Sequence, residues 1–292
     1  MNMDKELERL INSVIEKAID DSEASDKLVD ALVSEYFQNT SEAKQQNLGD
    51  VLDALKVSAE KGNSRARLWF SFFVYKNDDL PAELKKLAIS FGSQCGYLTG
   101  IFYAAEILLD DVFRPRDYFY NPRGGILGQI MLNEPDYALS EAAGRYQFIV
   151  DNFEPDEDGQ YPDWVLYAAV EAARLNLNKR GFGPGLPIGD EEKALSDLDF
   201  VMENGKGEQF ARAAATKGAY LLEKSRDVEA ADCFIAAIEN DPDSVSEFCR
   251  EHFHDREAYD RVLAACEAAK DNMSPDGLEG LETFPYCWHN WH

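Results

Sequence analysis

The chain has 292 residues, of which 45% are hydrophobic and 12% aromatic, a composition that predicts a folded protein and excludes an intrinsically disordered one. Its formal net charge of -26 at pH 7 argues against binding to nucleic acid or to anionic membrane surfaces, because both are negatively charged themselves. The same charge attracts basic partners, or it serves only to keep a helical surface in solution.

The N-terminal segment, residues 4–20, carries an apolar stripe at helical spacing and no uninterrupted apolar run. We therefore expect an amphipathic helix there, and neither a signal peptide nor a membrane anchor. No other segment approaches the ~20 apolar residues that a membrane span needs. The five cysteines are widely spread and odd in number, which predicts reduced thiols and a cytoplasmic location.

The following helices show the clearest internal repetition. Apolar spacing predicts a helix that ends in the polar stretch 38–41, and a partner from about Leu48 to Lys61. Gly62 and Gly96 are then separated by the same interval as Ala66 and Gly100, an interval within the ~20–50 residues of helical repeats. Glycine ends a helix where a left-handed conformation is needed, and small residues let two helices approach closely.

The segment that closes the helix from about Leu48 to Lys61 resembles a known repeat. It reads Ser58-Ala-Glu-Lys-Gly62. It is similar to the Sel1-like subclass of tetratricopeptide-type repeats, whose helices end in an Ala-Ala-Glu-x-Gly pattern. The second copy, residues 92–97, is degenerate. The resemblance implies stacked helical hairpins, each of which buries its apolar face on its neighbour.

A second segment, residues 211–244, resembles the tetratricopeptide repeat itself. Its match departs from the family where Ala214 replaces an aromatic residue and Lys217 replaces a leucine. The short polar break at residues 225–227 predicts an antiparallel helical hairpin, and a proline ends its second helix. The residues at the family's relative spacing are Gly218, Ala230, Phe234, Ala237 and Pro242.

Together these features predict an all-α fold, a right-handed superhelical solenoid of about six antiparallel helix hairpins of Sel1-like or tetratricopeptide type. We expect residues 1–150 to form an N-terminal half with an insertion at 110–134. The acidic turn region 151–162 marks the boundary. Residues 151–292 then form a C-terminal half that closes with capping helices and an aromatic tail.

The insertion is the most suggestive candidate for partner binding, because arginine and tyrosine are enriched at binding hot spots. The alternative is that its arginines neutralise nearby acids and its aromatic rings fill the gap that the insertion makes. The predicted helix after Gly62 also carries more aromatic residues than one narrow stripe of its surface can bury. The candidate partner-binding residues are Arg114, Arg116, Tyr118, Tyr120, Arg123, Trp69 and Tyr75.

No catalytic constellation is recognisable in the sequence, and the glycine-rich stretch 181–189 follows a helix where a phosphate-binding loop needs a strand. We therefore expect no cofactor. The C-terminal cysteines and histidines could hold zinc, but their spacing is not that of a zinc finger, and we favour buried thiols with exposed histidines. The metal candidates are Cys249, His252, Cys287 and His289.

The resemblance implies a non-catalytic adaptor whose first helices line a groove that holds a protein or peptide. Its acidity suggests a basic partner, and we expect neither nucleic acid nor membrane as a ligand. A second hypothesis is an acidic inhibitor or immunity-type protein that occludes a basic enzyme such as a nuclease or toxin. A third is a metal-dependent enzyme that uses the C-terminal Cys and His residues.

Overall fold

The structure is a computed structural model that describes residues 5–77, 79–113, 135–177, 190–241 and 243–245, with single positions between 260 and 275. The ranges up to residue 241 contain eleven α-helices and no strand, which confirms the predicted all-α class. The helices are α1 (Lys5–Lys17), α2 (Glu23–Gln38), α3 (Ser41–Glu60), α4 (Ser64–Tyr75), α5 (Ala82–Gln94), α6 (Leu98–Phe113), α9 (Pro135–Asn152), α10 (Asp163–Leu177), α11 (Glu191–Asn204), α12 (Glu208–Glu223) and α13 (Asp227–Asn240).

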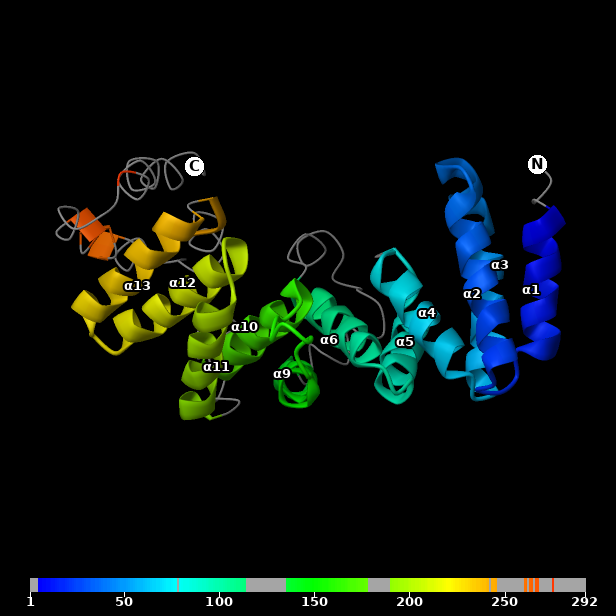
Figure 1. The fold of residues 1–292 in the computed structure, drawn as a ribbon, viewed down its shortest axis with the longest axis horizontal. Coiled ribbons are helices and arrows are strands. Elements are labelled where there is room, and N and C mark those ends of the chain that lie inside the picture. The colour runs from blue at the N-terminus through cyan, green and yellow to red at the C-terminus, as the bar shows by residue number, and fades with distance from the viewer. Residues whose placement is uncertain are drawn as a thin grey trace. The chain divides into compact units, whose positions relative to one another are not determined.

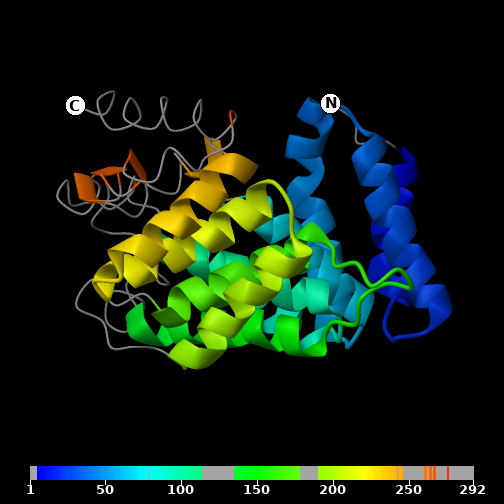
Figure 2. The same ribbon diagram turned by 60° about the vertical axis from the view of Figure 1, so that its left-hand side comes forward.

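Neighbouring helices pack in sequential pairs, as Figure 1 and Figure 2 show for α4 with α5 and for α12 with α13. Several alternate helices are also in contact: α1 with α3, α2 with α4, α4 with α6, and α10 with α12. This pattern agrees with the predicted stacking of hairpins, in which the first helices of successive hairpins touch. We call α2, α4 and α6 one first-helix row, and α10 with α12 the other.

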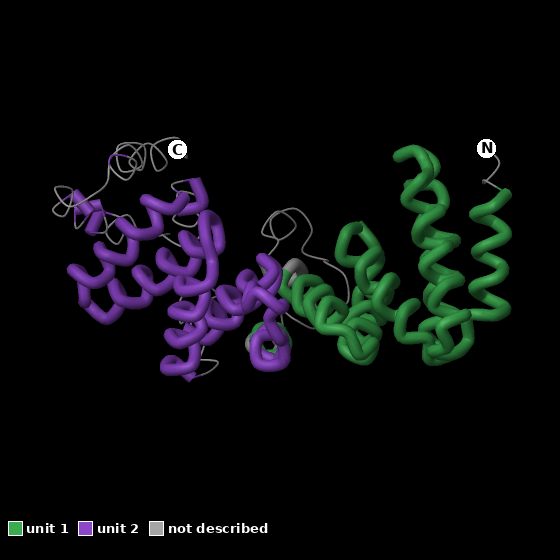
Figure 3. The backbone as a smooth tube through the Cα atoms, viewed as in Figure 1, with its two compact units in different colours: residues 1–145 green, residues 146–292 purple. Residues whose placement is uncertain are grey.

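The chain divides into two compact units, residues 1–145 and 146–292, coloured separately in Figure 3. The division falls inside α9. Unit 1 has an apolar core built from α1 to α5 with Ile107 of α6. Unit 2 has a core between α10, α11 and α12, and another that joins α12 to α13. None of the described helices is both long and apolar enough to cross a membrane.

Side-chain caps set the beginnings of α2, α3 and α4 in unit 1. The hydroxyl of Ser22 accepts a hydrogen bond from the backbone N–H of Ser25 at 3.3 Å, and Thr40 does the same for Ala43 at 3.4 Å. Because Thr40 caps α3, that helix begins at Ser41, and the predicted start near Leu48 was too late. Its first turns are almost entirely polar, so they carry no apolar stripe from which the start could be read.

The two glycine turns of the predicted repeat adopt the expected conformation. Gly62 has a φ of 112° and Gly96 a φ of 77°, both in the region that favours glycine. The close approach of small residues is also present between α5 and α6, since a Cβ atom on Gly92 would lie 2.4 Å from the carbonyl oxygen of Gly100. Gly62 and Gly96 therefore mark the ends of helices, and Gly92 and Gly100 mark a close contact between two helices.

Buried Asn63 ties two turns of unit 1 together. Its Oδ1 atom accepts from the backbone N–H of Ala66 at 2.6 Å and so caps α4, while its Nδ2 group donates to the carbonyl oxygen of Asp20 at 2.7 Å. The Ser58 hydroxyl donates to the carbonyl oxygen of Ala18 nearby. These bonds link the turn that precedes α4 to the turn that precedes α2, which places the starts of two first helices side by side.

Unit 2 contains the helical hairpin predicted for residues 211–244. Helix α12 ends at Glu223, Ser225 takes a positive φ of 58°, and α13 begins at Asp227, so the polar break is the turn between the helices. The ring of Phe234 is fully buried and lies against Gly218 of α12. Asp190 caps α11 by accepting hydrogen bonds from the backbone N–H groups of Glu192 and Lys193.

Candidate functional site

Two of the residues predicted for partner binding lie in the described part of the chain, and both are on α4. They are Trp69 and Tyr75. Among the described residues, no group of three or more His, Cys, Asp and Glu side chains could hold a metal ion. The other candidates lie outside the described residues: Arg114, Arg116, Tyr118, Tyr120 and Arg123 of the insertion, and Cys249, His252, Cys287 and His289 of the C-terminal segment.

Trp69 and Tyr75 belong to a continuous cluster of rings along the first-helix row of unit 1. The ring centroids of Trp69 and Phe72 are 5.5 Å apart, and those of Phe72 and Tyr103 are 5.4 Å apart. Tyr75 stacks on Tyr103 at 5.3 Å. Phe37 reaches Phe72 from α2 at 6.2 Å. We define the aromatic face as Phe37, Trp69, Phe72, Tyr75, Phe102 and Tyr103.

The aromatic face is only partly covered by the rest of unit 1. The side chain of Phe37 is 44% exposed, whereas Phe73, which lies beneath it in the core, is 2% exposed. Trp69, Phe72 and Tyr103 are half-buried, and this burial raises the pKa of the Tyr103 hydroxyl. Large rings that lie between core and solvent provide a rigid, mostly apolar contact surface.

A polar cluster centred on Asp30 borders the aromatic face. The Asp30 carboxylate accepts from Arg65 Nε and Nη2 at 3.2 and 3.1 Å, and from Trp69 Nε1 at 2.9 Å. The guanidinium carbon of Arg65 also lies 5.6 Å from the centroid of the Tyr97 ring. Burial is the largest influence on Arg65 and opposes its charge, but the hydrogen bond to Asp30 and the nearby charges of Asp30, Tyr97 and Asp26 together outweigh it and raise the pKa of Arg65. Arg65 and Trp69, both on α4, thus hold the Asp30 carboxylate of α2 in place.

Our reading of the sequence missed Asp30, Arg65 and Phe37. One signal was available, since Asp26, Asp30 and Phe37 share a face of α2 at helical spacing. It could not show that Trp69, far along the chain, would donate to Asp30. That contact depends on how α2 and α4 pack.

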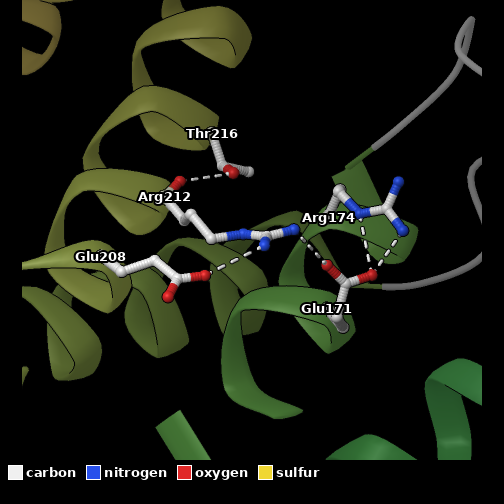
Figure 4. Close-up of polar contacts among 5 residues, drawn as sticks. All are labelled: Glu171, Arg174, Glu208, Arg212 and Thr216. Atoms are coloured by element: carbon white, nitrogen blue, oxygen red, sulfur yellow. Dashed lines mark hydrogen bonds and ion pairs between the residues drawn. The ribbon is translucent and has the colours of Figure 1, made fainter. Parts of the chain in front are cut away.

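The first-helix row of unit 2 carries a charged cluster instead, which Figure 4 shows in close-up. Glu171 of α10 has a side chain only 2% exposed and forms an ion pair with Arg174, whose Nε donates to it at 2.9 Å. Arg212 of α12 approaches Glu171 at 3.8 Å and Glu208 at 3.4 Å. Its guanidinium carbon lies 5.4 Å from the centroid of the Tyr167 ring.

The charges in this cluster support one another. Burial disfavours the charged form of Arg174, but the charge and hydrogen bonds of Glu171 more than compensate and raise the pKa of Arg174. Since Glu171 faces two arginines, removal of its carboxylate would leave two guanidinium groups close together in a poorly hydrated place. The cluster therefore joins α10 to α12 within unit 2.

A second buried carboxylate in unit 2, Asp197 on α11, is less well compensated. Lys193 donates to Asp197 at 2.9 Å and to Asp151 at 3.1 Å. Burial raises the pKa of Asp197, and the hydrogen bond and charge of Lys193 offset this only in part. The folded protein therefore holds a proton on Asp197 at pH values where the unfolded chain has released it.

We expect the substitution Asp197→Asn to make unit 2 more stable relative to the wild type as the pH rises from about 4 towards neutrality. A raised carboxyl pKa gives stability that is present below the unfolded pKa and is lost as the pH rises through the folded pKa. Asparagine does not titrate, so the variant does not lose stability in this way as the pH rises. Hydrogen exchange of α11 peptides over a pH series measures the difference. Lys193→Met should extend the effect to higher pH, and a difference that is independent of pH would contradict the assignment.

Comparisons of the chain with protein-family models, with curated proteins and with solved structures found no match. The described residues form an all-helical protein whose helices pack in sequential pairs. The aromatic face lies on one first-helix row, and the charged cluster lies on the other.

Proposed function

We propose that this chain is a helical-repeat protein of Sel1-like or tetratricopeptide type that binds another protein and carries out no catalysis itself. In this proposal the stacked hairpins form a right-handed superhelix, and the first helices bear the docking surface. The observation that carries the proposal is the aromatic face of unit 1. Its rings come from three different helices, and yet they touch one another in an unbroken series.

Exposure of such rings to water is unfavourable, and their position suits a contact with a partner. Phe37 leaves 44% of its side chain accessible while its neighbour Tyr36 is 6% exposed, so the outer ring adds little to the core. Aromatic residues are enriched at the centres of protein interfaces, because they bring large contact areas and lose little conformational freedom. Asp30, held by Arg65 and Trp69, supplies a fixed polar group at the edge of the face.

The second candidate function is an acidic inhibitor or immunity-type protein that occludes a basic enzyme such as a nuclease or toxin. The net charge of -26 favours it, because a strong field of one sign accelerates association with an oppositely charged partner. This hypothesis predicts a one-to-one complex whose association rate falls steeply with salt. The adaptor proposal predicts a complex that withstands salt, since apolar contacts with the aromatic face hold it together.

Affinity capture with the full chain tests the proposal, with Phe37→Ser as the variant and Phe148→Ser as its control. Both rings are exposed, at 44% and 49%, so neither substitution should unfold the protein, but only Phe37 is on the aromatic face. We expect Phe37→Ser to reduce recovery of a salt-resistant partner about fivefold or more, and Phe148→Ser to leave it unchanged. A partner retained by both variants contradicts docking at this face. A single basic partner that is lost only at high salt supports the inhibitor hypothesis.

A further inference from the structure

We infer that the aromatic face of unit 1 binds a basic segment of a protein, with an arginine or lysine side chain beside Asp30 and another on the face of Phe37. The inference rests on the proposed protein-binding function and names the chemistry of the partner. It follows from three features of the described residues: cations that unit 1 itself already places on aromatic rings, the position of carboxylates beside those rings, and the charge of the chain.

The internal cations show which chemistry this surface favours. The ammonium nitrogen of Lys44 lies 5.6 Å from the centroid of the Phe37 ring, and that of Lys76 lies 4.6 Å from the centroid of Tyr75. A cation over the face of an aromatic ring is attracted by the ring's quadrupole. Phe73 stacks on the Phe37 ring, and Lys44 reaches the ring from another helix, α3. A cation of the partner would therefore take the place that Lys44 holds at the Phe37 ring.

Asp30 completes the recognition of a cation. Arg65 shows the arrangement, since its guanidinium donates to the Asp30 carboxylate and also lies over the Tyr97 ring. A carboxylate can accept about four hydrogen bonds, and Asp30 accepts two from Arg65 and one from Trp69. Its side chain is 40% exposed, so a further donor can reach it from solvent.

The order of groups along α2 sets the spacing of the segment. Asp26, Asp30 and Phe37 follow one another on a single face of the helix, with the carboxylates before the ring. A segment that lies along α2 would therefore place one cation at the carboxylates and its next basic or apolar side chains on Phe37 and Phe72. With a net charge of -26, the chain as a whole favours a basic segment over an acidic one.

Fluorescence anisotropy with the full chain tests the inference. The probe is a short labelled peptide that alternates arginine with leucine, and the matched control replaces every arginine by citrulline, which has the same shape without the charge. Titrations at about 0.15 M salt suppress the contribution of distant charges. We expect the arginine peptide to bind and the citrulline peptide to bind at least about tenfold more weakly.

Variants locate the binding site. Asp30→Asn should weaken binding of the arginine peptide about fivefold to tenfold, whereas Asp53→Asn, which removes an exposed carboxylate on α3, should change it less than about twofold. Phe37→Leu keeps an apolar side chain but removes the ring, and it should weaken binding about threefold. Lys44→Met frees the Phe37 ring and should strengthen binding more than Lys56→Met on the same helix.

Equal losses for Asp30→Asn and Asp53→Asn would overturn the inference, because they would show non-specific attraction to an acidic surface. Equal affinities for the arginine and citrulline peptides would also overturn it. Neither result would contradict the proposed function, because a partner captured through Phe37 could still bind by an apolar segment. Conversely, peptide binding that follows Asp30 and Phe37 would support this chemistry even if capture recovered no partner.

Discussion

The substitution Phe234→Ala is expected to destabilise the α12–α13 hairpin by about 3–5 kcal/mol, the cost typical of an aromatic ring removed from a protein core. Phe234 is fully buried on α13 and belongs to the core that joins α13 to α12. Hydrogen exchange of α12 and α13 peptides in urea is the appropriate measurement, because it reports the loss of stability locally. Peptides of α2 and α4 provide the internal reference.

The contact between Phe234 and Gly218 makes this prediction specific. A Cβ atom on Gly218 would lie 2.8 Å from the ring, so Gly218→Ala should destabilise the wild-type hairpin. In the Phe234→Ala background the obstacle is gone, and the same substitution should stabilise the helix by about 1 kcal/mol through helix propensity. As a control, Val228→Ala on α13 changes a residue that is 77% exposed and should alter stability by less than about 0.5 kcal/mol. If Gly218→Ala has the same sign in both backgrounds, the proposed contact is wrong.

The substitution Glu171→Ala should cost about 2–3 kcal/mol, somewhat below the roughly 3–5 kcal/mol of a fully buried ion pair. Its carboxylate is 2% exposed, but Arg174 and Arg212 are 14% and 25% exposed, so water can partly solvate the arginines that lose their partner. The loss should appear as faster hydrogen exchange in α10 and α12, the two helices that the cluster joins. Peptides of unit 1 should be unaffected.

Two further variants separate the charge of Glu171 from its packing. Glu208→Ala removes an acid of the same cluster that is 57% exposed, and it should cost less than about 1 kcal/mol. The double variant Glu171→Met with Arg174→Met replaces the pair by apolar side chains and should recover most of the stability that Glu171→Ala loses. A loss for Glu208→Ala as large as that for Glu171→Ala would show that burial does not set the cost.

The charged cluster and the aromatic face give the two first-helix rows different chemical characters. In unit 1 the row presents rings beside one carboxylate, whereas in unit 2 it presents arginines paired with buried and exposed acids. The hydrogen bond from the hydroxyl of Thr216 to the carbonyl oxygen of Arg212, at 2.8 Å, is local to α12 and adds no ligand-binding group. Our proposal therefore assigns partner binding to unit 1, and we regard the unit 2 cluster as a structural link between α10 and α12.

Part of the candidate surface was accessible from the sequence. The crowded aromatic residues after Gly62 exceeded what a narrow stripe can bury, and this excess pointed to Trp69 and Tyr75. Phe72 lies with them on α4, but the other members of the aromatic face come from α2 and α6. Asp30 on α2 is reached by Arg65 and Trp69 from α4. No local pattern contains these pairings, because they depend on the packing of helices that are distant in sequence.

What the sequence by itself determined was the all-helical class and the turns that begin or end several of its helices. Gly62 and Gly96 take positive φ because glycine alone adopts that conformation without strain, and Asp190 caps α11 through its own neighbours. Only the tertiary structure decided which helix faces meet, and so which rings, carboxylates and arginines lie together. Backbone conformation depends on nearby residues, whereas contacts such as Trp69 with Asp30 and Gly218 with Phe234 depend on how whole helices fit against each other.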